Sequence, residues 1–318
     1  MKWIFLIIAA GIVLFAGASF LIKPEFVETT PEPIRIILAG DIMLDRGVEY
    51  MIEKYGEGNF EFPFLKIAGE FQKADVVFGN LEGPISDKGE KVGSIYSFRA
   101  DPRAIEGLKF AGFNVLSLAN NHAFDYGRQA LEDNLAKLSR SGIDYVGAGF
   151  NESEAYSPVI KEINGTKIGF LAYTDLGSPY WKATADASGI AWIDEEQLGL
   201  AKSQIEKAKS EVDILIVSLH SGEEYAEAPA QFQVEFSKAA IDAGADLTVG
   251  HHPHVVQKPE IYNGKYIFYS LGNFIFDQAF SEETMEGQIV EILIENGKIR
   301  EIIPINIKIN EFFQPEIK

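Results

Sequence analysis

Short apolar runs rich in β-branched residues alternate along this chain with amphipathic stretches of helical length, and this alternation is the strongest constraint on its fold. Such alternation is typical of β-α-β units, whose strands are buried on both faces. The predicted strands are Ile34–Ala39, Asp75–Phe78, Val115–Leu118, Tyr145–Gly147, Asp213–Leu219 and Asp246–Val249. The predicted helices are Pro63–Gln72, Pro102–Ala111, Gly127–Ser139, Asp194–Lys209 and Ala230–Ala243. We therefore expect an α/β fold.

Three Asn-Gly pairs interrupt the alternation, and each one separates two strand-like runs. Asn-Gly is the strongest short hairpin signal, because both central residues of a type I′ turn need a positive φ. The pairs are Asn164-Gly165, Asn263-Gly264 and Asn296-Gly297. Antiparallel hairpins are therefore expected among the α/β units. We predict two mixed sheets packed together, with helices on their outer faces.

The N-terminal segment from Trp3 to Ile22 is an almost unbroken apolar run. About twenty apolar residues allow a helix to cross a hydrocarbon core of roughly 30 Å. We expect residues 1–22 to be a transmembrane anchor, which places the protein in the cell membrane with its domain outside the cytoplasm. The alternative is a signal peptide cut near Ala18, which would release a secreted protein. Residues 23–33 contain three prolines and are expected to form an extended linker before a domain spanning residues 34–318.

The composition excludes several classes of function. The formal net charge is −19 and the sequence pI is about 4.7. Nucleic acid binding needs a basic surface, so we expect no nucleic acid partner. The absence of cysteine excludes disulfides, a zinc–thiolate site and a cysteine nucleophile. The chain also lacks a Gly-x-Ser-x-Gly elbow and a Walker-type phosphate loop.

All five histidines fall in three short patches: His122, His220 and the segment from His251 to His254. Neutral imidazole is the commonest side-chain metal ligand, and a His-x-His at the end of a strand can bring two nitrogens to one ion. The alternative is a few core or surface histidines without a joint role. We predict a metal site.

Polar clusters follow the C-terminal ends of five predicted strands. In open α/β sheets, ligands bind in the crevice beyond those ends. Taken singly, the clusters have structural alternatives: Asp41 as a helix N-cap, Asn80 and Glu82 as turn residues, and Asn121 in an Asx-turn. Their joint occurrence favours ligation of a metal. The predicted ligands are Asp41, Asn80, Glu82, Asn121, His220, His252 and His254.

The order of these residues resembles the order of the ligands in dinuclear metallophosphoesterases. A closer resemblance, from about Ile34 to Phe276, is to the CapA family, which is implicated in capsule and poly-γ-glutamate synthesis. The matching motifs are Gly40–Arg46, Asn80–Glu82, Ser117–Gly127, His220–Tyr225, Gly250–Gln257 and Tyr269–Phe274. The resemblance implies a four-layer α/β/β/α sandwich of the metallophosphatase-like type in an exported, often membrane-anchored protein.

Two positions depart from the metallophosphoesterase pattern. Those enzymes open with Asp-x-His, but the third position here is Met43, a poor ligand for a hard or borderline metal. Asn80 stands where those enzymes have a bridging aspartate, with Glu82 nearby. We therefore expect a divalent metal, Mn, Fe or Zn, as cofactor. The centre is expected to hold either one ion or two ions, of which the first is bound weakly.

The same resemblance implies roles in catalysis. His122 matches the histidine that protonates the leaving oxygen, and Asp125 would orient its ring, although Asp125 is equally suited to begin the next helix. Arginines near the motifs are candidate clamps for phosphate or carboxylate groups, with exposed surface residues as the alternative. The predicted substrate-binding residues are Arg46, Arg99, Arg128, Glu223, His251 and Asn273.

Two functions from different classes follow from these observations. The first is an exported metal-dependent hydrolase that acts on a phosphoester or a cell-surface polymer. The second is a non-catalytic accessory or polymer-binding subunit of a capsule biosynthesis complex. Met43 and Asn80 favour the accessory, whereas the Asn121-His122 pair and the His-x-His favour the hydrolase. The expected partners are the cell membrane, other capsule or poly-γ-glutamate synthesis subunits, and an acidic polymer or phosphoester ligand.

Overall fold

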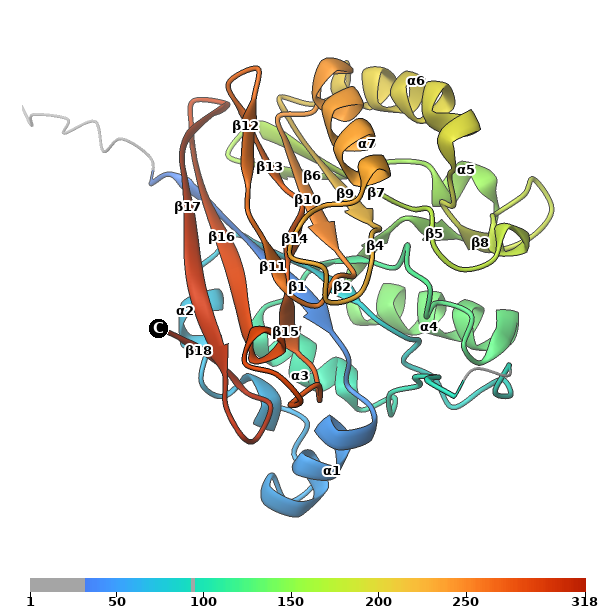
Figure 1. The fold of residues 1–318 in the computed structure, drawn as a ribbon, viewed down its shortest axis with the longest axis vertical. Helices are drawn as coiled ribbons and strands as arrows, with labels where there is room; N and C mark the ends of the chain where they lie inside the picture. Colours follow the sequence, from blue (N-terminus) through green and yellow to red (C-terminus); the bar gives the residue numbers. More distant parts are fainter. Residues whose placement is uncertain (1–31, 93–94) are drawn as a thin grey trace, which may run out of the picture. The chain divides into compact units, whose positions relative to one another are not determined.

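A computed structural model of the protein describes residues 32–92 and 95–318 (Figure 1). The predicted anchor or signal segment, residues 1–22, and nearly all of the predicted linker lie outside the described residues. Within the two described ranges, every helix is too short or too polar to span a bilayer.

The larger sheet has eight strands and is mixed. Four strands, β1 to β4, run parallel, and β16 to β18 add an antiparallel half on the other side of β1. The short strand β15 (Asn273–Ile275) also pairs with β1, in parallel. In spatial order the other strands are β18 (Pro315–Ile317), β17 (Lys298–Ile309), β16 (Glu286–Glu295), β1 (Ile34–Ile42), β2 (Val76–Leu81), β3 (Val115–Ser117) and β4 (Asp144–Val146).

The second sheet has six strands, with four central parallel strands between two antiparallel edge strands. In order they are β12 (Glu260–Tyr262), β13 (Lys265–Phe268), β10 (Leu247–His251), β9 (Ile214–His220), β7 (Thr166–Thr174) and β6 (Val159–Ile163). Two small sheets complete the strands of the described residues: β11 (Val256–Gln257) with β14 (Ser270–Leu271), and β5 (Ala148–Gly149) with β8 (Gly189–Ile190).

All three Asn-Gly pairs form the predicted hairpin turns. They connect β6 to β7, β12 to β13 and β16 to β17. Both residues of each pair have a positive φ, for example 50° at Asn164 and 78° at Gly165. This is the conformation that a type I′ turn requires, so the hairpins predicted from the sequence are confirmed.

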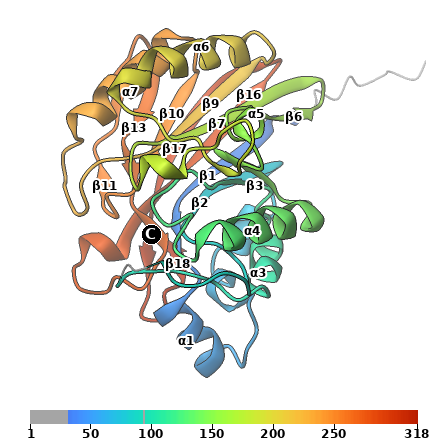
Figure 2. The same cartoon turned by 90° about the vertical axis from the view of Figure 1, so that its right-hand side faces the viewer.

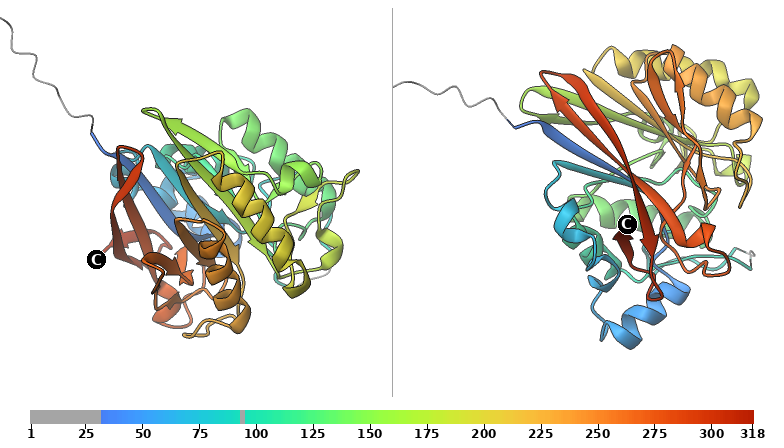
Figure 3. Two further views of the ribbon diagram at one scale, coloured as in Figure 1. Left: turned by 90° about the horizontal axis from the view of Figure 1, so that it is seen from above. Right: turned by 60° about the vertical axis from the view of Figure 1, so that its left-hand side comes forward.

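The two large sheets pack face to face on a shared apolar core (Figure 3). Ile36 and Leu38 of β1 point into this core, while Ile37 and Ala39 lie in the cluster on the other face of the sheet. This alternation with a period of two is what a strand buried on both faces shows. Across the sheets, the rings of Phe78 and Phe170 stack with their centroids 5.6 Å apart.

Helices cover the outer face of each sheet (Figure 2). The first sheet is covered by α1 (Arg46–Tyr55), α2 (Ala68–Phe71), α3 (Ala104–Ala111) and α4 (Gly127–Ser141). The second sheet is covered by α6 (Leu198–Lys209) and α7 (Gln231–Asp242). The other helical segments are α5 (Glu152–Ala155) and the 3-10 turns η1 (Phe62–Phe64), η2 (Pro179–Trp181), η3 (Glu195–Gln197) and η4 (Glu283–Met285).

The prediction of a mixed α/β fold with several sheets is confirmed, but the helices differ in two places. The predicted helix Pro63–Gln72 is wrong: η1 and α2 are two short segments with a turn between them. Helix α1 was not predicted; its N-terminus is capped by the Asp45 side chain, which accepts the Arg46 N–H. An aspartate before an amphipathic stretch is an ordinary signal for a helix start, so this helix was predictable.

Candidate metal centre

Strand register brings the predicted polar residues to one end of both sheets. Asp41 of β1 pairs with Asn80 of β2 on one side and with Asn273 of β15 on the other. In the second sheet, His220 of β9 pairs with His251 of β10. The paired ends face each other between the sheets, because Asp41 Oδ1 lies 3.3 Å from His251 Nδ1.

Asp41 faces the second sheet because the register of β1 is irregular there. Strict alternation would place its side chain with Ile37 and Ala39 under the helices, but the pairing with β2 shifts between Leu38 and Asp41. Such an irregularity is a common device for re-aiming a side chain at a site. The alternative of Asp41 as a helix N-cap is wrong, since it lies within a strand and Asp45 caps α1.

Gly40 permits the close approach that fixes Asp41. A Cβ atom at Gly40 would lie 2.1 Å from the carbonyl oxygen of Gly272, closer than real atoms come. The same carbonyl accepts the backbone N–H of Asp41 at 3.1 Å. A larger residue at position 40 would therefore push the segment before β15 away from β1.

Asp41, Glu82 and His220 form a buried group suited to a metal ion. One potential ligand atom from each lies within 4.8 Å of the other two, and all three side chains are buried. Glu82 Oε2 has no hydrogen-bond partner among the described residues. A buried carboxylate oxygen without a partner costs free energy, and a divalent cation is one means of removing that cost.

His252 and His254 lie beside this group on a strained turn. The backbone φ is 98° at His252 and 58° at His254, values that non-glycine residues rarely adopt. The His220 and His252 ring centroids are 5.0 Å apart, and His252 Nδ1 has no hydrogen-bond partner in the described part of the chain. Strain of this kind persists where the surrounding structure imposes it, and it is concentrated at functional sites.

Glu224 was not among the predicted site residues, although it lies in the motif His220–Tyr225. Its carboxylate, the third member of a second group, has an oxygen within 4.8 Å of potential ligand atoms of His252 and His254. Glu223, which we predicted to bind substrate, is exposed and belongs to neither group. The signal available from sequence, two adjacent glutamates after a strand, does not say which of them faces inward.

Burial decides the protonation of most of these groups. It lowers the pKa of His220 well below the usual value and, together with His254, lowers the pKa of His252 to about 3. Burial raises the pKa of Glu82, and the neighbouring Asp41 carboxylate raises it further. Neutral imidazoles and a carboxylate that an ion can deprotonate fit a borderline cation such as Mn²⁺, Fe²⁺ or Zn²⁺.

Asp41 behaves differently from the other carboxylate. Burial alone raises the pKa of Asp41, but the His251, His254 and His220 rings outweigh it and hold that pKa below its usual range. Its Oδ2 also accepts the backbone N–H of His252 at 3.0 Å. Asp41 is therefore the anionic member of the centre.

Amide side chains fix the ring of His220. Asn120 Nδ2 donates to Asn80 Oδ1 at 3.1 Å, so the amide nitrogen of Asn80 faces Asp41 Oδ1 at 2.9 Å and His220 Nδ1 at 3.2 Å. On the other side of the ring, Asn121 Oδ1 lies 2.8 Å from His220 Nε2. In this arrangement both amides orient the His220 ring. Asn80 faces it with its nitrogen, which cannot ligate a cation, whereas Asn121 faces it with its oxygen. That Asn80 and Asn121 are metal ligands stays a prediction.

His122 and Asp125 form the pair that the family resemblance implies. His122 Nδ1 lies 2.7 Å from Asp125 Oδ2, and the same oxygen accepts the backbone N–H of Phe98 at 2.7 Å. Asp125 precedes α4, but no side chain caps that helix. His122 Nε2 lies 3.9 Å from Glu82 Oε2, which places the ring next to the first group. The catalytic roles of the pair stay a prediction.

Asn273 contacts a histidine in this structure. Its Nδ2 donates to Gln278 Oε1 and to the Thr284 carbonyl, both at 3.0 Å, so its Oδ1 is the acceptor for His254 Nδ1 at 3.0 Å. His254 therefore carries its proton on Nδ1, which leaves Nε2 as the nitrogen for a metal. His251 is fully buried between the sheets, and neither of its ring nitrogens has a hydrogen-bond partner among the described residues.

The three predicted arginine clamps are all engaged within the protein. Arg46 forms two hydrogen bonds to Asp277 and lies over the ring of Phe98, 5.1 Å from its centroid. Arg99 donates to the carbonyls of Lys88 and Gly89. Arg128 donates to Ser188 Oγ. Arg46 is linked to the centre through Phe98, whose ring centroid lies 4.1 Å from that of His122.

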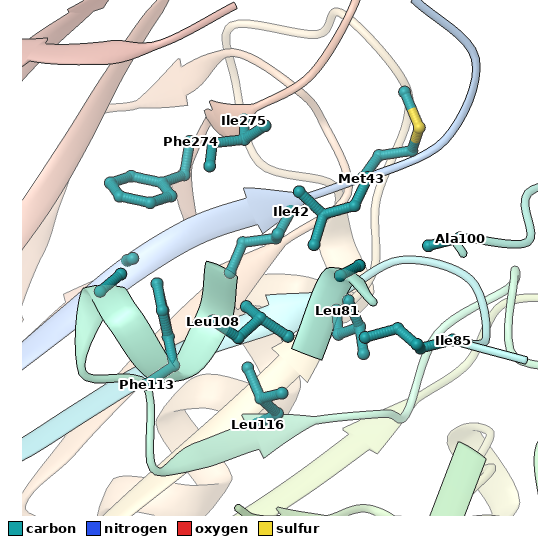
Figure 4. Close-up of a cluster of buried hydrophobic side chains, with 14 of the residues drawn as sticks. Ile42, Met43, Leu81, Ile85, Ala100, Leu108, Phe113, Leu116, Phe274 and Ile275 are labelled. Atoms are coloured by element: carbon teal, nitrogen blue, oxygen red, sulfur yellow. The ribbon is translucent and has the colours of Figure 1, made fainter. Parts of the chain in front are cut away.

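Met43 stands where metallophosphoesterases have a histidine ligand. It is fully buried in the apolar cluster under the helices, with Ile42, Leu81 and Ile275 (Figure 4). Its sulfur lies 3.2 Å from the Asp45 backbone nitrogen. Met43 therefore belongs to the hydrophobic core and supplies no ligand.

The mixed α/β fold described above is similar to a solved structure. A solved phosphatase from Mycoplasma pneumoniae matches with a TM-score of 0.51 and 17% identity, over 87% of this chain and 94% of that one. The sequence profile described as bacterial capsule synthesis protein PGA_cap matches residues 35–278. The chain belongs to this family, which confirms the resemblance predicted from its motifs.

Two named relatives share most of their length with this chain. The capsule biosynthesis protein CapA of Bacillus anthracis is 32% identical, over 96% of this chain and 76% of its own length. The PGA biosynthesis protein CapA of Bacillus subtilis is 34% identical, over 96% of this chain and 81% of its own length. The similarity therefore extends across the whole fold and is not confined to the ligand motifs.

Proposed function

We propose that the chain acts in capsule or poly-γ-glutamate synthesis or export as a metal-dependent hydrolase of a phosphoester or a cell-surface polymer. One observation carries the proposal. Asp41, Glu82 and His220 form a buried ligand group, and His122 Nε2 lies 3.9 Å from the unpartnered Glu82 Oε2. A group able to hold a cation and a group able to transfer a proton are thus adjacent.

The chemistry divides between the cation and the side chains. When bound by Asp41, Glu82 and His220, a divalent ion supplies Lewis acidity, which lowers the pKa of water toward about 7 and offsets charge on a phosphoryl or carbonyl oxygen. Asp125 accepts the Nδ1–H of His122, which fixes the ring and leaves Nε2 to carry a proton to a leaving oxygen. The Asp125 carboxylate also stabilises the imidazolium form that carries this proton.

A non-catalytic role in a capsule biosynthesis complex is the second candidate. Met43 lies in the core and Asn80 presents an amide nitrogen, so two positions that supply ligands in metallophosphoesterases supply none here. Under this alternative the same centre binds a polymer or stabilises the fold, and no turnover occurs.

Attachment to a membrane through residues 1–22 and association with other synthesis subunits complete the proposal. The apolar run from Trp3 to Ile22 supports the first, and membership of a capsule synthesis family supports the second. Fractionation of cells that produce the full chain, with and without residues 1–22, tests the attachment: recovery of both proteins in the soluble fraction would contradict it.

The test of hydrolysis uses the full chain loaded with Mn²⁺, Fe²⁺ or Zn²⁺. Bis(p-nitrophenyl) phosphate and a γ-glutamyl amide are the two probes. We expect metal-dependent turnover of one probe, with kcat lowered about 10²–10⁴-fold by His122→Ala and with metal content unchanged. A protein that holds metal but turns over neither probe with any of the three ions would favour the non-catalytic role.

A further inference from the structure

We propose that Glu224, His252 and His254 form a second divalent-cation position, for which Glu224 is the carboxylate ligand. The inference rests on the proposed metal centre, which it extends from one group to two. Glu224 is not among the residues that the metallophosphoesterase pattern supplies, so the pattern alone does not predict it. The assignment of Glu224 comes from the contacts around the loop that follows β9.

The backbone holds Glu224 against the histidine turn. Tyr225 N–H donates to the Pro253 carbonyl at 2.8 Å, and Ser221 N–H donates to the His251 carbonyl at 3.1 Å. These two bonds bracket Glu224 and connect the loop to both ends of the turn that carries His252. The ring of Tyr225 also lies near that of His254, with the centroids 6.2 Å apart. Main-chain contacts on both sides of Glu224 therefore hold its backbone against the turn.

His252 supplies an independent indication that a ligand belongs at this position. It is buried, its Nδ1 has no hydrogen-bond partner among the described residues, and its φ of 98° is unfavourable for a residue with a Cβ atom. A buried nitrogen without a partner costs free energy, and so does the strained backbone. A cation bound by Glu224, His254 and the Nδ1 atom of His252 would give that nitrogen a partner.

The charge of the centre supports the same assignment. Asp41 Oδ2 lies 3.5 Å from His254 Nδ1 and accepts the His252 N–H, so this carboxylate lies between the two groups. With Met43 and Asn80 in place of a histidine and an aspartate, two divalent ions would have only Asp41 and Glu82 as anionic ligands. Glu224 adds a third carboxylate, which compensates for the missing aspartate.

Metal stoichiometry tests this inference without any assay of activity. The chelator-treated full chain is equilibrated with Mn²⁺ and separated from free ion, and the manganese retained per chain is measured. The wild type, Glu224→Gln and His220→Ala are compared with Glu227→Gln, a matched control that removes the same charge from an exposed glutamate of the same loop. Glu224 is itself exposed, so its replacement is expected to leave the fold intact.

We expect two equivalents in the wild type and in Glu227→Gln, and one in Glu224→Gln, whose second equivalent binds at least about tenfold more weakly. His220→Ala is expected to lose the other ion. A Glu224→Gln protein that retains the wild-type number of ions at wild-type affinity overturns the inference and leaves the proposed function standing. A wild type that retains no manganese overturns both.

Discussion

Amide side chains fix the orientation of the imidazole rings in this centre. Asn80 and Asn121 contact the two ring nitrogens of His220, and Asn273 accepts the Nδ1–H of His254. The ring of His254 therefore presents one defined nitrogen, Nε2, and its position and tautomer are fixed before a cation binds. The ligands of this centre thus depend on neighbours that are not ligands.

Asn273→Ala tests this dependence. Loss of the acceptor for His254 Nδ1 is expected to weaken Mn²⁺ binding about 10–100-fold, because the ring is then free to turn. Asn134→Ala is the matched control: Asn134 is equally buried and its Oδ1 accepts the Ile85 N–H at 3.2 Å. Titration calorimetry measures both. Equal losses of affinity in the two variants would show a general effect on stability.

The pKa of His252 predicts how stability depends on pH in the chelator-treated protein. Burial and His254 lower this pKa from 6.5 to about 3, so between those values the unfolded chain binds a proton that the folded protein does not. The free energy of unfolding must then fall as the pH falls, by about 1.4 kcal/mol per pH unit for one such histidine. His252→Asn should remove that part of the slope.

Urea unfolding of wild type and His252→Asn at pH 7, 5.5 and 4.5 measures the two slopes. Identical slopes would contradict the lowered pKa of His252. His220 contributes in the same direction, because burial also lowers its pKa, so the variant is expected to retain part of the dependence.

The sequence predicted which residues gather at the centre, but not which atoms face it. Histidines and carboxylates at strand ends can be recognised from residue types and spacing. The direction of the Asn80 amide depends on a bond from Asn120, and the choice of Glu224 over Glu223 depends on contacts between the loop after β9 and the 251–254 segment. Such contacts join distant parts of the chain and leave no local pattern.

At the scale of secondary-structure elements, the strands and the turns between them determine where the site residues lie. The parallel strands β1, β9 and β10 carry Asp41, His220 and His251 near their C-terminal ends, and the hairpins add antiparallel strands to both sheets. None of the three Asn-Gly turns supplies a predicted ligand. The residues of these turns are therefore constrained by the backbone conformation of the turn and not by the metal centre.

A pair of glycine substitutions separates backbone conformation from packing. Gly165 has a φ of 78° and Gly199 lies in the first turn of α6, and a Cβ atom at either would meet nothing within 4 Å. We expect Gly165→Ala to destabilise the protein by about 1 kcal/mol and Gly199→Ala to stabilise it by about 0.5 kcal/mol. Urea unfolding checks both signs; stabilisation by Gly165→Ala would contradict the type I′ turn.

Element prediction succeeded where local signals are strong. Three Asn-Gly turns and the long strands follow from turn chemistry and apolar pattern. Strand β15 has three residues, and its pairing with β1 depends on Gly40 and on a chain segment more than 200 positions away, so no local pattern indicates it. The broken helix near Pro63 shows that amphipathic spacing in a short stretch does not by itself specify one continuous helix.

The whole molecule is organised around the contact between its two large sheets. Asp41 and Glu82 belong to the first sheet and the loop that follows it, whereas the ligating histidines belong to the second sheet and the turn after it. The distance between the ligand sets therefore depends on the apolar core between the sheets. Stability and cation binding are expected to be coupled through that core.

Phe170→Ala tests the coupling. Loss of the ring that stacks on Phe78 is expected to cost about 3–5 kcal/mol and to weaken Mn²⁺ binding, because the sheets can then shift. Phe236→Ala is the matched control, since Phe236 is equally buried but belongs to α7, outside the contact between the sheets. It should cost similar stability and leave the affinity unchanged; equal affinity losses would argue against the coupling.

The strained turn at His252 and His254 has a consequence for the speed of cation capture. Two protein contacts hold this turn: Asp41 accepts the His252 N–H, and the Pro253 carbonyl accepts the Tyr225 N–H. The strained conformation of the turn therefore forms when the protein folds. Binding of a cation then needs no slow rearrangement of the turn. In a stopped-flow experiment the observed rate should rise linearly with ion concentration and show no plateau, with dehydration of the ion setting its ceiling.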